Sequence, residues 1–138
     1  MSQVIPVLVA VLICDVAVAD PSTGKKNLIG VFDRINVGRF PTEHPMSVYL
    51  KLADAEGTYR LKVRYVRRDS GAILAEVQGD LQVANRLQSC DLVVSFPPLP
   101  IQSEGRFEFQ IWSNDIFLGG TFMDAVARPQ PPREKDHA

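Results

Sequence analysis

The sequence predicts an all-β protein, an antiparallel β-sandwich of seven or eight short strands. Apolar and polar residues alternate with the period-two spacing of strands in many short segments. Turn-forming residues recur about every 8 to 12 residues along the chain. No segment shows the apolar periodicity of an amphipathic helix. Many short strands joined by turns are typical of two packed sheets.

Length and composition indicate a single domain without an obligatory metal or disulfide. The chain has 138 residues, 46% of them hydrophobic, which suffices for a sizeable core. Fifteen basic and sixteen acidic residues leave a net charge of −1, so no nucleic-acid partner is expected. We assign residues 1–127 to the β-sandwich domain. Residues 128–138, RPQPPREKDHA, are expected to form a disordered Pro-rich polar tail.

The apolar segment VLVAVLICDVAVAD, from Val7 to Asp20, is compatible with a strand or with an export signal. Ala17-Val18-Ala19 fits a cleavage site, but the preceding MSQVIPV lacks the basic residues of a signal. The unbroken apolar run ends at Cys14 and is too short to span a membrane. We expect a central strand covered on both faces and a cytoplasmic protein. The alternative is an exported domain cut after Ala19.

The middle of the chain alternates between turns and strands. DPSTGKKN predicts a turn, LIGVFDRINV a second strand, and GRFPTEHP, with its prolines, a stretch without regular structure. Gly79 to Ser89 is left open as a strand at Leu81 to Val83 or an irregular crossover. The residues expected to face the core are Met46, Val48, Leu50, Leu52, Tyr59, Leu61, Val63, Tyr65, Leu92, Val94, Phe96, Phe107, Phe109 and Ile111.

Two hairpins can be placed from their turn residues. The first has a three-residue loop, Asp69-Ser70-Gly71, in which Gly71 takes the left-handed position. Its register pairs Tyr65 with Ala75, Val63 with Val77 and Arg64 with Glu76. The second has the two-residue loop Asn114-Asp115. Its register pairs Phe107 with Phe122, Phe109 with Gly120, Ile111 with Leu118 and Trp112 with Phe117.

The second hairpin yields the first candidate contact residues. Trp112 and Phe117 are expected on its outer face, where two exposed rings would form a binding hot spot. The alternative is that a loop or the PPLP segment covers them. A basic ribbon lies on the first hairpin and includes Arg60, Lys62, Arg64, Arg67 and Arg68. It is either a solvated face neutralised by nearby carboxylates or a dock for an acidic partner.

The sequence offers no catalytic, cofactor-binding or metal-binding constellation. His44 is expected in a loop, without the convergent His or Cys ligands of a zinc site. Asp15, Asp20 and Asp33 are too few for calcium, and Asp20 before Pro21 is typical of a turn start. STGKK lacks the first glycine of a phosphate loop. We therefore expect no cofactor and a non-enzymatic protein.

The two cysteines, Cys14 and Cys90, are expected to be free buried thiols, with one long-range bridge as the alternative. Trp112 follows both cysteines instead of lying between them, so the signature of a true immunoglobulin domain is absent. The expected architecture is therefore immunoglobulin-like or a related sandwich.

Four segments follow one another within Leu12 to Met123: CDVAVADPSTGKKNLIGVFDRI, GRFP, GTYRLKVRYVRRDSGAILAE and PPLPIQSEGRFEFQIWSNDIFLGGTF. Together they resemble a bacterial family of small single-domain β-sandwich proteins of unknown function. The resemblance implies that the first strand belongs to the mature fold, and it implies no activity. The PQPPREKDHA tail departs from the family pattern.

The leading hypothesis is a non-enzymatic intracellular binding or structural module that contacts an unidentified protein partner through Trp112 and Phe117. The alternative is an exported domain that binds a ligand or calcium. An enzymatic interpretation would need a pocket with convergent polar groups.

Overall fold

In the computed structural model, which describes residues 4–129, the chain folds into eleven strands and no helix. The strands are β1 (Val7–Ala19), β2 (Lys26–Val31), β3 (Arg34–Val37), β4 (Thr42–His44), β5 (Ser47–Ala53), β6 (Gly57–Arg67), β7 (Ile73–Val83), β8 (Cys90–Ser95), β9 (Leu99–Ile101), β10 (Gly105–Ser113) and β11 (Ile116–Ala127). Within these residues, no helix is long and apolar enough to cross a membrane.

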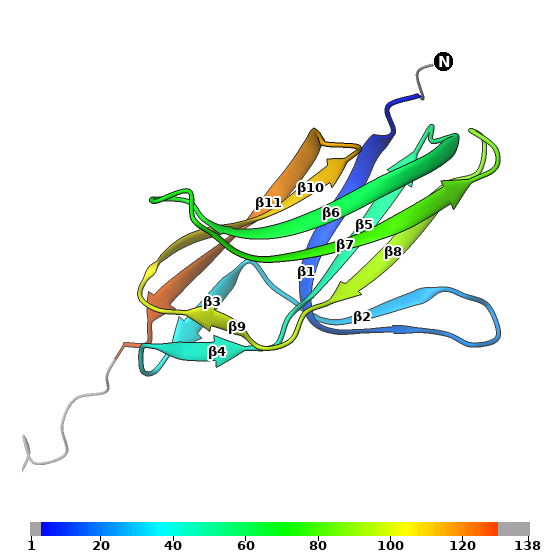
Figure 1. The fold of residues 1–138 in the computed structure, drawn as a ribbon. Helices are drawn as coiled ribbons and strands as arrows, with labels where there is room; N and C mark the ends of the chain where they lie inside the picture. The colour runs from blue at the N-terminus through cyan, green and yellow to red at the C-terminus, as the bar shows by residue number, and fades with distance from the viewer. Residues whose placement is uncertain (1–3, 130–138) are drawn as a thin grey trace, which may run out of the picture.

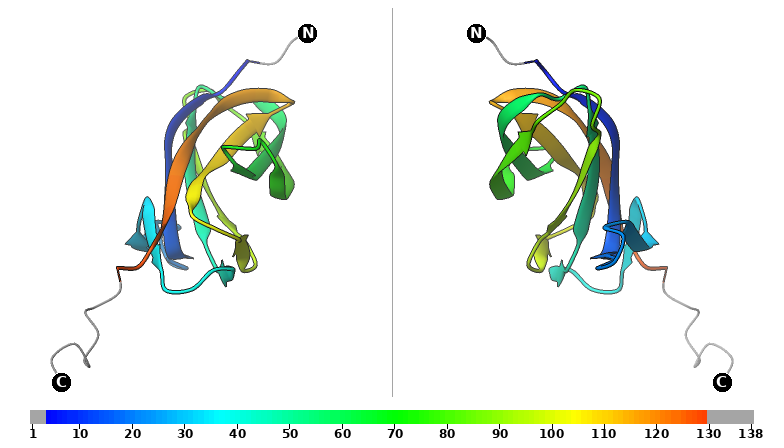
Figure 2. Two further views of the ribbon diagram at one scale, coloured as in Figure 1. Left: turned by 90° about the vertical axis from the view of Figure 1, so that its left-hand side faces the viewer. Right: turned by 90° about the vertical axis from the view of Figure 1, so that its right-hand side faces the viewer.

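Two sheets face each other, as Figures 1 and 2 show. Sheet A has the strand order β2-β1-β5-β8, and sheet B the order β3-β11-β10-β6-β7; β4 and β9 form a separate pair. Strands β1 and β11 adjoin on one side of the molecule, and β7 and β8 border the other side (Figure 2). The all-β class is confirmed, and every described pairing is antiparallel except the parallel pair β3–β11.

The core lies between the inner faces of sheets A and B. All the predicted core residues face it, although Leu92 and Val94 of β8 are only partly buried. The ring of Tyr65 stacks on Phe107 with centroids 5.2 Å apart and contacts Phe109 at 5.1 Å. The Tyr65 hydroxyl donates a 3.0 Å hydrogen bond to the Pro100 carbonyl. Burial raises the pKa of Tyr65, so this buried hydroxyl keeps its proton and remains a donor at neutral pH.

The opening apolar segment is strand β1, an interior strand of sheet A between β2 and β5. Its expected place in the fold is confirmed, but the expected cover on both faces is wrong. Within the run Val7 to Ile13 on which that expectation was based, Val9 is 54% and Leu12 is 40% exposed. In a two-layer sandwich each sheet has one face toward the core and one toward solvent, and the second face of β1 is not covered by a further layer.

The expected second strand, LIGVFDRINV, is two strands in different sheets. Strand β2 pairs with β1 in sheet A, whereas β3 pairs with β11 in sheet B. The chain crosses between the layers at Phe32-Asp33, where the ladder of β2 has ended. This split accounts for part of the difference between eleven strands and the expected seven or eight.

The prolines of GRFPTEHP do not exclude regular structure, so this prediction is wrong in part. Thr42–His44 forms β4, paired with Leu99–Ile101 of β9. Pro41 and Pro45 flank β4 and do not interrupt it, which is where strands tolerate proline. Within Gly79 to Ser89, β7 continues to Val83, so the strand alternative is the correct one.

The first predicted hairpin is confirmed in its pairing from Tyr65 toward the start of β6, but its loop is one residue longer than expected. Arg67 and Ala72 close a four-residue loop, and a β-bulge between Tyr65 and Val66 restores the expected register. Gly71 has φ of 73°, and its amide donates to the Arg67 carbonyl. Strands β6 and β7 pair as expected, Tyr65 with Ala75, Val63 with Val77 and Arg64 with Glu76.

The second hairpin has the predicted loop but a partly different register. Asn114 and Asp115 both have positive φ, 48° and 65°, and Trp112 pairs with Phe117 as expected. A β-bulge between Ile111 and Trp112 then shifts the ladder by one residue. The observed pairs are Phe107 with Met123, Phe109 with Thr121 and Ile111 with Gly119, so the three expected pairs are wrong.

The bulge exchanges the faces of two large side chains. Met123 is fully buried in the core, whereas Phe122 is 40% exposed on the outer face of sheet B.

The amide of Arg128, the first residue of the expected tail, donates to the Val37 carbonyl at 2.7 Å. Residues 130–138 of that tail lie outside the described residues.

Two glycines make a matched pair for testing this register. An added Cβ at Gly120 would lie 2.5 Å from the Phe109 carbonyl oxygen, a backbone atom, whereas at Gly79 it would meet nothing within 4 Å. Gly120→Ala is therefore expected to lower the free energy of unfolding by about 1–3 kcal/mol. Gly79→Ala is expected to be neutral or stabilising by up to about 1 kcal/mol. Chemical denaturation measures both, and equal effects of the two substitutions would contradict the register.

Candidate functional site

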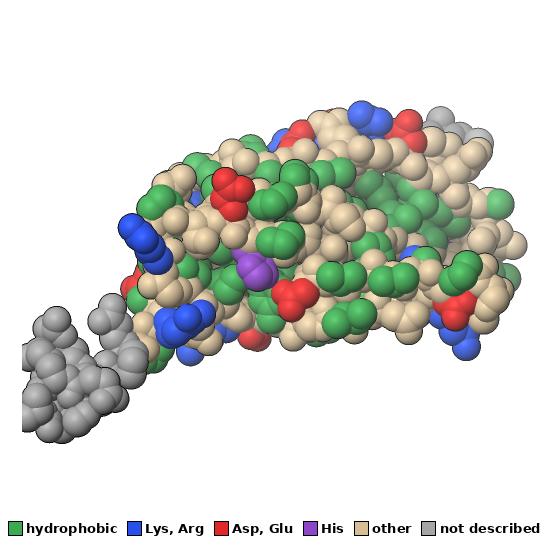
Figure 3. Space-filling view, turned by 90° about the horizontal axis from the view of Figure 1, so that it is seen from below, with side chains coloured by type: hydrophobic (Ala, Val, Ile, Leu, Met, Phe, Trp, Pro, Cys, Tyr) green, Lys and Arg blue, Asp and Glu red, His purple; other side chains and the backbone are tan. Residues whose placement is uncertain are grey.

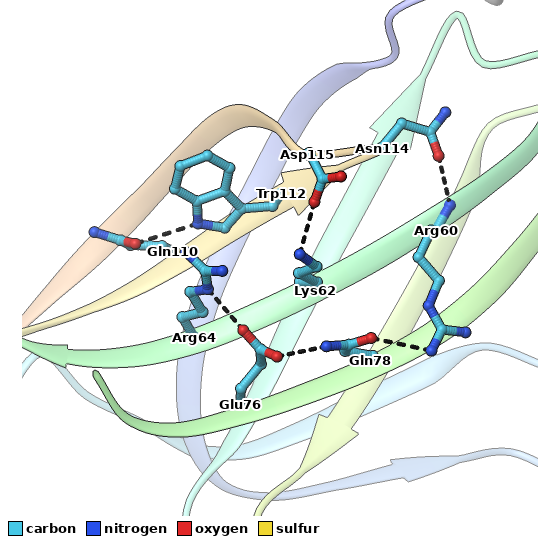
Figure 4. A network of polar contacts seen from close by, with 9 residues as sticks. All are labelled: Arg60, Lys62, Arg64, Glu76, Gln78, Gln110, Trp112, Asn114 and Asp115. Carbon is cyan, nitrogen blue, oxygen red and sulfur yellow. Dashed lines mark hydrogen bonds and ion pairs between the residues drawn. The ribbon is translucent and has the colours of Figure 1, made fainter.

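The candidate site lies on the outer face of sheet B, where four of the predicted contact residues are neighbours. Alternation along β6 and β10 directs Lys62, Arg64 and Trp112 away from the core, because Leu61, Val63 and Ile111 face inward. The ladder sets Trp112 between Phe117 on one side and Lys62 on the other. Figure 4 shows Arg60, Lys62 and Arg64 along β6, with Trp112 on the adjoining strand.

The rings of Trp112 and Phe117 contact each other, and Phe117 is the more exposed to solvent. Trp112 and Phe117 meet edge to face, with centroids 5.3 Å apart and planes at 60°. Phe117 is 47% exposed and Trp112 is half-buried. The predicted surface pair is therefore present, and the PPLP segment, which continues into β9, does not bury Phe117.

The indole of Trp112 is fixed by polar neighbours and not by a loop. Its Nε1 donates to the Gln110 side-chain oxygen at 3.2 Å, as Figure 4 shows. The Arg64 guanidinium lies over the ring, 5.0 Å from its centroid, in cation–π contact. These contacts hold the ring in one orientation while Phe117 extends the apolar surface at its edge.

The three cations of the patch are already paired. Arg60 contacts Asp80 at 3.0 Å, Lys62 contacts Asp115 at 2.6 Å, and Arg64 contacts Glu76 at 2.7 Å. Hydrogen bonds from Lys62 and Arg64 hold the pKa of Asp115 and of Glu76, respectively, below their ordinary values. Among the carboxylates near the ribbon, Glu76 neutralises Arg64 here, and Asp69 pairs with Arg67 at 3.0 Å outside the patch. The patch is consequently close to neutral at pH 7 despite its basic residues.

A chain of hydrogen bonds links these pairs across strands. Glu76 accepts from both Arg64 and the Gln78 amide, and Gln78 in turn accepts from Arg60 at 3.0 Å (Figure 4). The backbone amide of Arg60 donates to the side-chain oxygen of Asn114 in the loop beside Trp112, at 2.8 Å. The network therefore connects β7, β6 and the β10–β11 loop, and it orients the side chains around the aromatic pair.

A third exposed ring, Phe122, was not predicted from the sequence. The guanidinium groups of Arg106 and Arg68 lie 5.0 and 5.4 Å from its centroid. Arg106 also makes two hydrogen bonds to Asp124, at 2.8 and 3.0 Å. The β-bulge places Phe122 outside, and the Gly119-Gly120 pair is the sequence signal that could have indicated it.

The other residues considered from the sequence lie apart from this face. His44 belongs to β4, not to a loop as expected; its Nε2 lies 3.3 Å from Asp15, and its ring meets Phe32 edge-on. Asp20 caps its turn as expected, accepting from the amide and hydroxyl of Ser22 at 2.8 and 2.7 Å. Among the described residues, no group of His, Cys, Asp and Glu could hold a metal ion.

Both cysteines are free. Cys14 is buried and faces away from the core between Val31 and Ser47, whereas Cys90 is half-buried and pairs with the core residue Leu52. The two thiols thus occupy opposite faces of sheet A. Burial raises the pKa of each, so both are protonated and weakly nucleophilic at neutral pH.

Trp112, the chain's single tryptophan, reports directly on the Arg64–Glu76 pair. Because the folded pKa of Glu76 is depressed, the pair is complete above the ordinary carboxyl value of 4.5 and is lost as the pH falls through the lower folded value. Tryptophan fluorescence is expected to stay constant from pH 7 to about 4.5 and to change below it. In Glu76→Gln this acid transition should shrink. An unchanged transition would show that the pair does not position the indole.

Comparison with known proteins gives a family and no activity. No curated protein matches the chain. Residues 9–124 match a family described as a family of unknown function, DUF6941, and this match includes the first hairpin and most of β1 and of the second hairpin. The chain is therefore a member of the DUF6941 family of unknown function.

Proposed function

We propose that the protein is a non-enzymatic binding module that contacts a protein partner through the outer face of sheet B. The observation that carries the proposal is the Trp112–Phe117 pair, with one ring 47% exposed and the other fixed beneath Arg64. Tryptophan and arginine are enriched among the residues that dominate binding energies, and a ring oriented before binding loses little entropy on contact.

The ion pairs formed by the three cations make a polyanionic partner less favourable than an apolar protein segment. Arg60, Lys62 and Arg64 each have a carboxylate within 3.0 Å, so an acidic ligand would compete with existing ion pairs. An aromatic surface with neutral polar surroundings fits an apolar protein segment better than a polyanion. The proposal is therefore a protein–protein contact, with the rings at its centre and the ion pairs at its rim.

We include the intracellular location in this proposal. It is supported by the two free cysteines, because disulfides form and persist in oxidising compartments and are rare in the cytosol.

Substitution of single rings tests the contact. Phe117→Ala and Trp112→Ala are each expected to weaken partner capture by about 2 kcal/mol or more, roughly 30-fold, as at interface hot spots. Phe122→Ala is the matched control, because it removes another exposed ring from β11 without touching the pair. Quantitative affinity capture from host lysate gives the readout, and denaturation curves verify folding. Equal capture by Phe117→Ala and wild type, or unfolding of Trp112→Ala because its ring is core, would refute the proposed role of the pair.

The salt dependence of the same capture separates a protein from a polyanion. Since the cations are paired, raising salt from about 50 to 200 mM should change capture only slightly, whereas several phosphate contacts would weaken binding by orders of magnitude. A steep loss of capture with salt would contradict the proposed partner class.

The proposed location is tested by the intact mass of the protein purified from its host under thiol-blocking conditions. The expected species is full length with both Cys14 and Cys90 alkylated. A species lacking residues 1–19 would identify the export alternative as correct and would remove β1 from the mature fold.

A further inference from the structure

A slot with apolar walls opens between the edge strands of the two sheets. Its volume is about 200 Å³, and β5, β6, β7 and β8 all contribute to it. The aliphatic residues that line it are Leu50, Leu61, Val63, Val77, Leu92, Val93 and Val94. In Figure 3, hydrophobic side chains gather in a hollow on the face seen from below.

The slot exists because one side chain is missing from an otherwise apolar row. Along β7 the residues that face the core are Ala75, Val77, Gly79, Leu81 and Val83. Gly79 stands opposite the buried Leu61, yet a Cβ added there would meet nothing within 4 Å. Its φ lies outside the left-handed region, so the backbone does not require glycine. The gap is thus a free position for a side chain supplied from elsewhere.

The strands that border the slot each have a free edge. Strand β7 is the last strand of sheet B and β8 the last strand of sheet A, so among the described residues each pairs along one side only. The free side of an edge strand presents backbone N–H and C=O groups to an added strand. An extended peptide alongside β7 could therefore form backbone hydrogen bonds and direct alternate side chains toward Gly79.

The charge of the two edge strands has one sign. Strands β7 and β8 carry Glu76, Asp80 and Asp91 and contain no lysine or arginine. Their cationic partners belong to other strands, Arg64 and Arg60 to β6 and Lys26 to β2. The Asp80 side chain is 71% exposed, and its surface ion pair with Arg60 contributes little. Of the three carboxylates, Asp80 beside the slot is therefore the one most accessible to a further basic side chain.

We propose that the free edge of β7 takes an extended basic–aliphatic peptide segment of a protein partner as an additional strand. An aliphatic side chain of this segment fills the slot beside Gly79, and alternate Lys or Arg side chains lie beside Glu76 and Asp80 on the outer side. This site goes beyond the proposed role of Trp112 and Phe117, which lie on other strands, and either site can fail without the other.

The test uses a synthetic probe, the heptapeptide KVKLKVK, titrated into the isotope-labelled full-length protein. Binding is expected to shift the backbone amide resonances of residues 76–80. In Gly79→Val the added side chain occupies the slot, which should weaken binding about tenfold or more. Gln82→Val is the matched control, because it adds valine on the outer face of the same strand. Its affinity should equal that of wild type.

Variant peptides keep the test independent of the folding of Gly79→Val. KVKGKVK lacks the side chain for the slot, and EVELEVE reverses the charge; both should bind more weakly than KVKLKVK. The proposal is overturned if KVKLKVK shifts no amide in residues 76–80, if KVKGKVK binds equally well, or if a folded Gly79→Val keeps the wild-type affinity.

Discussion

The contact between the inner faces of sheets A and B is the constraint on which the rest of the structure depends. Each strand of the sandwich has a period of two, so fixing which residues face inward also fixes which face outward. The aromatic cluster of Tyr65, Phe107, Phe109 and Phe96 fills the space between the layers, and Tyr65 is tied to the β9 segment through the Pro100 carbonyl. A one-residue slip would turn Tyr65 outward in β6, or Phe107 and Phe109 in β10.

The outer face of sheet B follows from that constraint. Since Val63 and Tyr65 are core residues, Lys62 and Arg64 must point outward, and the ladders bring carboxylates from β7 and from the β10–β11 loop to them. The same alternation places Trp112 outside, where Arg64 covers one part of its ring. The result is an aromatic pair surrounded by ion-paired side chains with little net charge. Strand β6 alone would present a row of unpaired cations.

The features that could be predicted from the sequence are those set by turn-forming residues and by the alternation of apolar and polar residues. Gly71 and the Asn114-Asp115 pair fixed two loops, and the apolar rows fixed the core faces of β5, β6 and β10. The errors arose where one residue changes the periodicity. The bulge in the β10–β11 ladder, next to the Asn114-Asp115 loop, moved Phe122 outward, and the crossing at Phe32-Asp33 divided one expected strand between two sheets. Both outcomes are set by long-range packing.

The candidate site was predictable in its members and in part of its electrostatics. Trp112 and Phe117 follow from the turn, whose register holds at the first pairs. The β6–β7 register sets Arg64 opposite Glu76 and Arg60 opposite Asp80. Asp115 becomes a neighbour of Lys62 only because β10 lies beside β6. The slot beside Gly79 could not be predicted from the sequence. A glycine within a strand leaves a gap in the core only if the residues opposite it do not fill the space, and those residues are known only from the structure.

The most direct test of the neutral aromatic surface is collisional quenching of Trp112 fluorescence by neutral acrylamide, anionic iodide and cationic caesium. A half-buried indole among paired charges should be quenched partially by acrylamide, with iodide and caesium about equally effective once corrected for their intrinsic efficiencies. Much stronger quenching by iodide than by caesium would mean an uncompensated basic patch. An indole inaccessible to all three quenchers would mean that the ring is core, and either result would contradict the account.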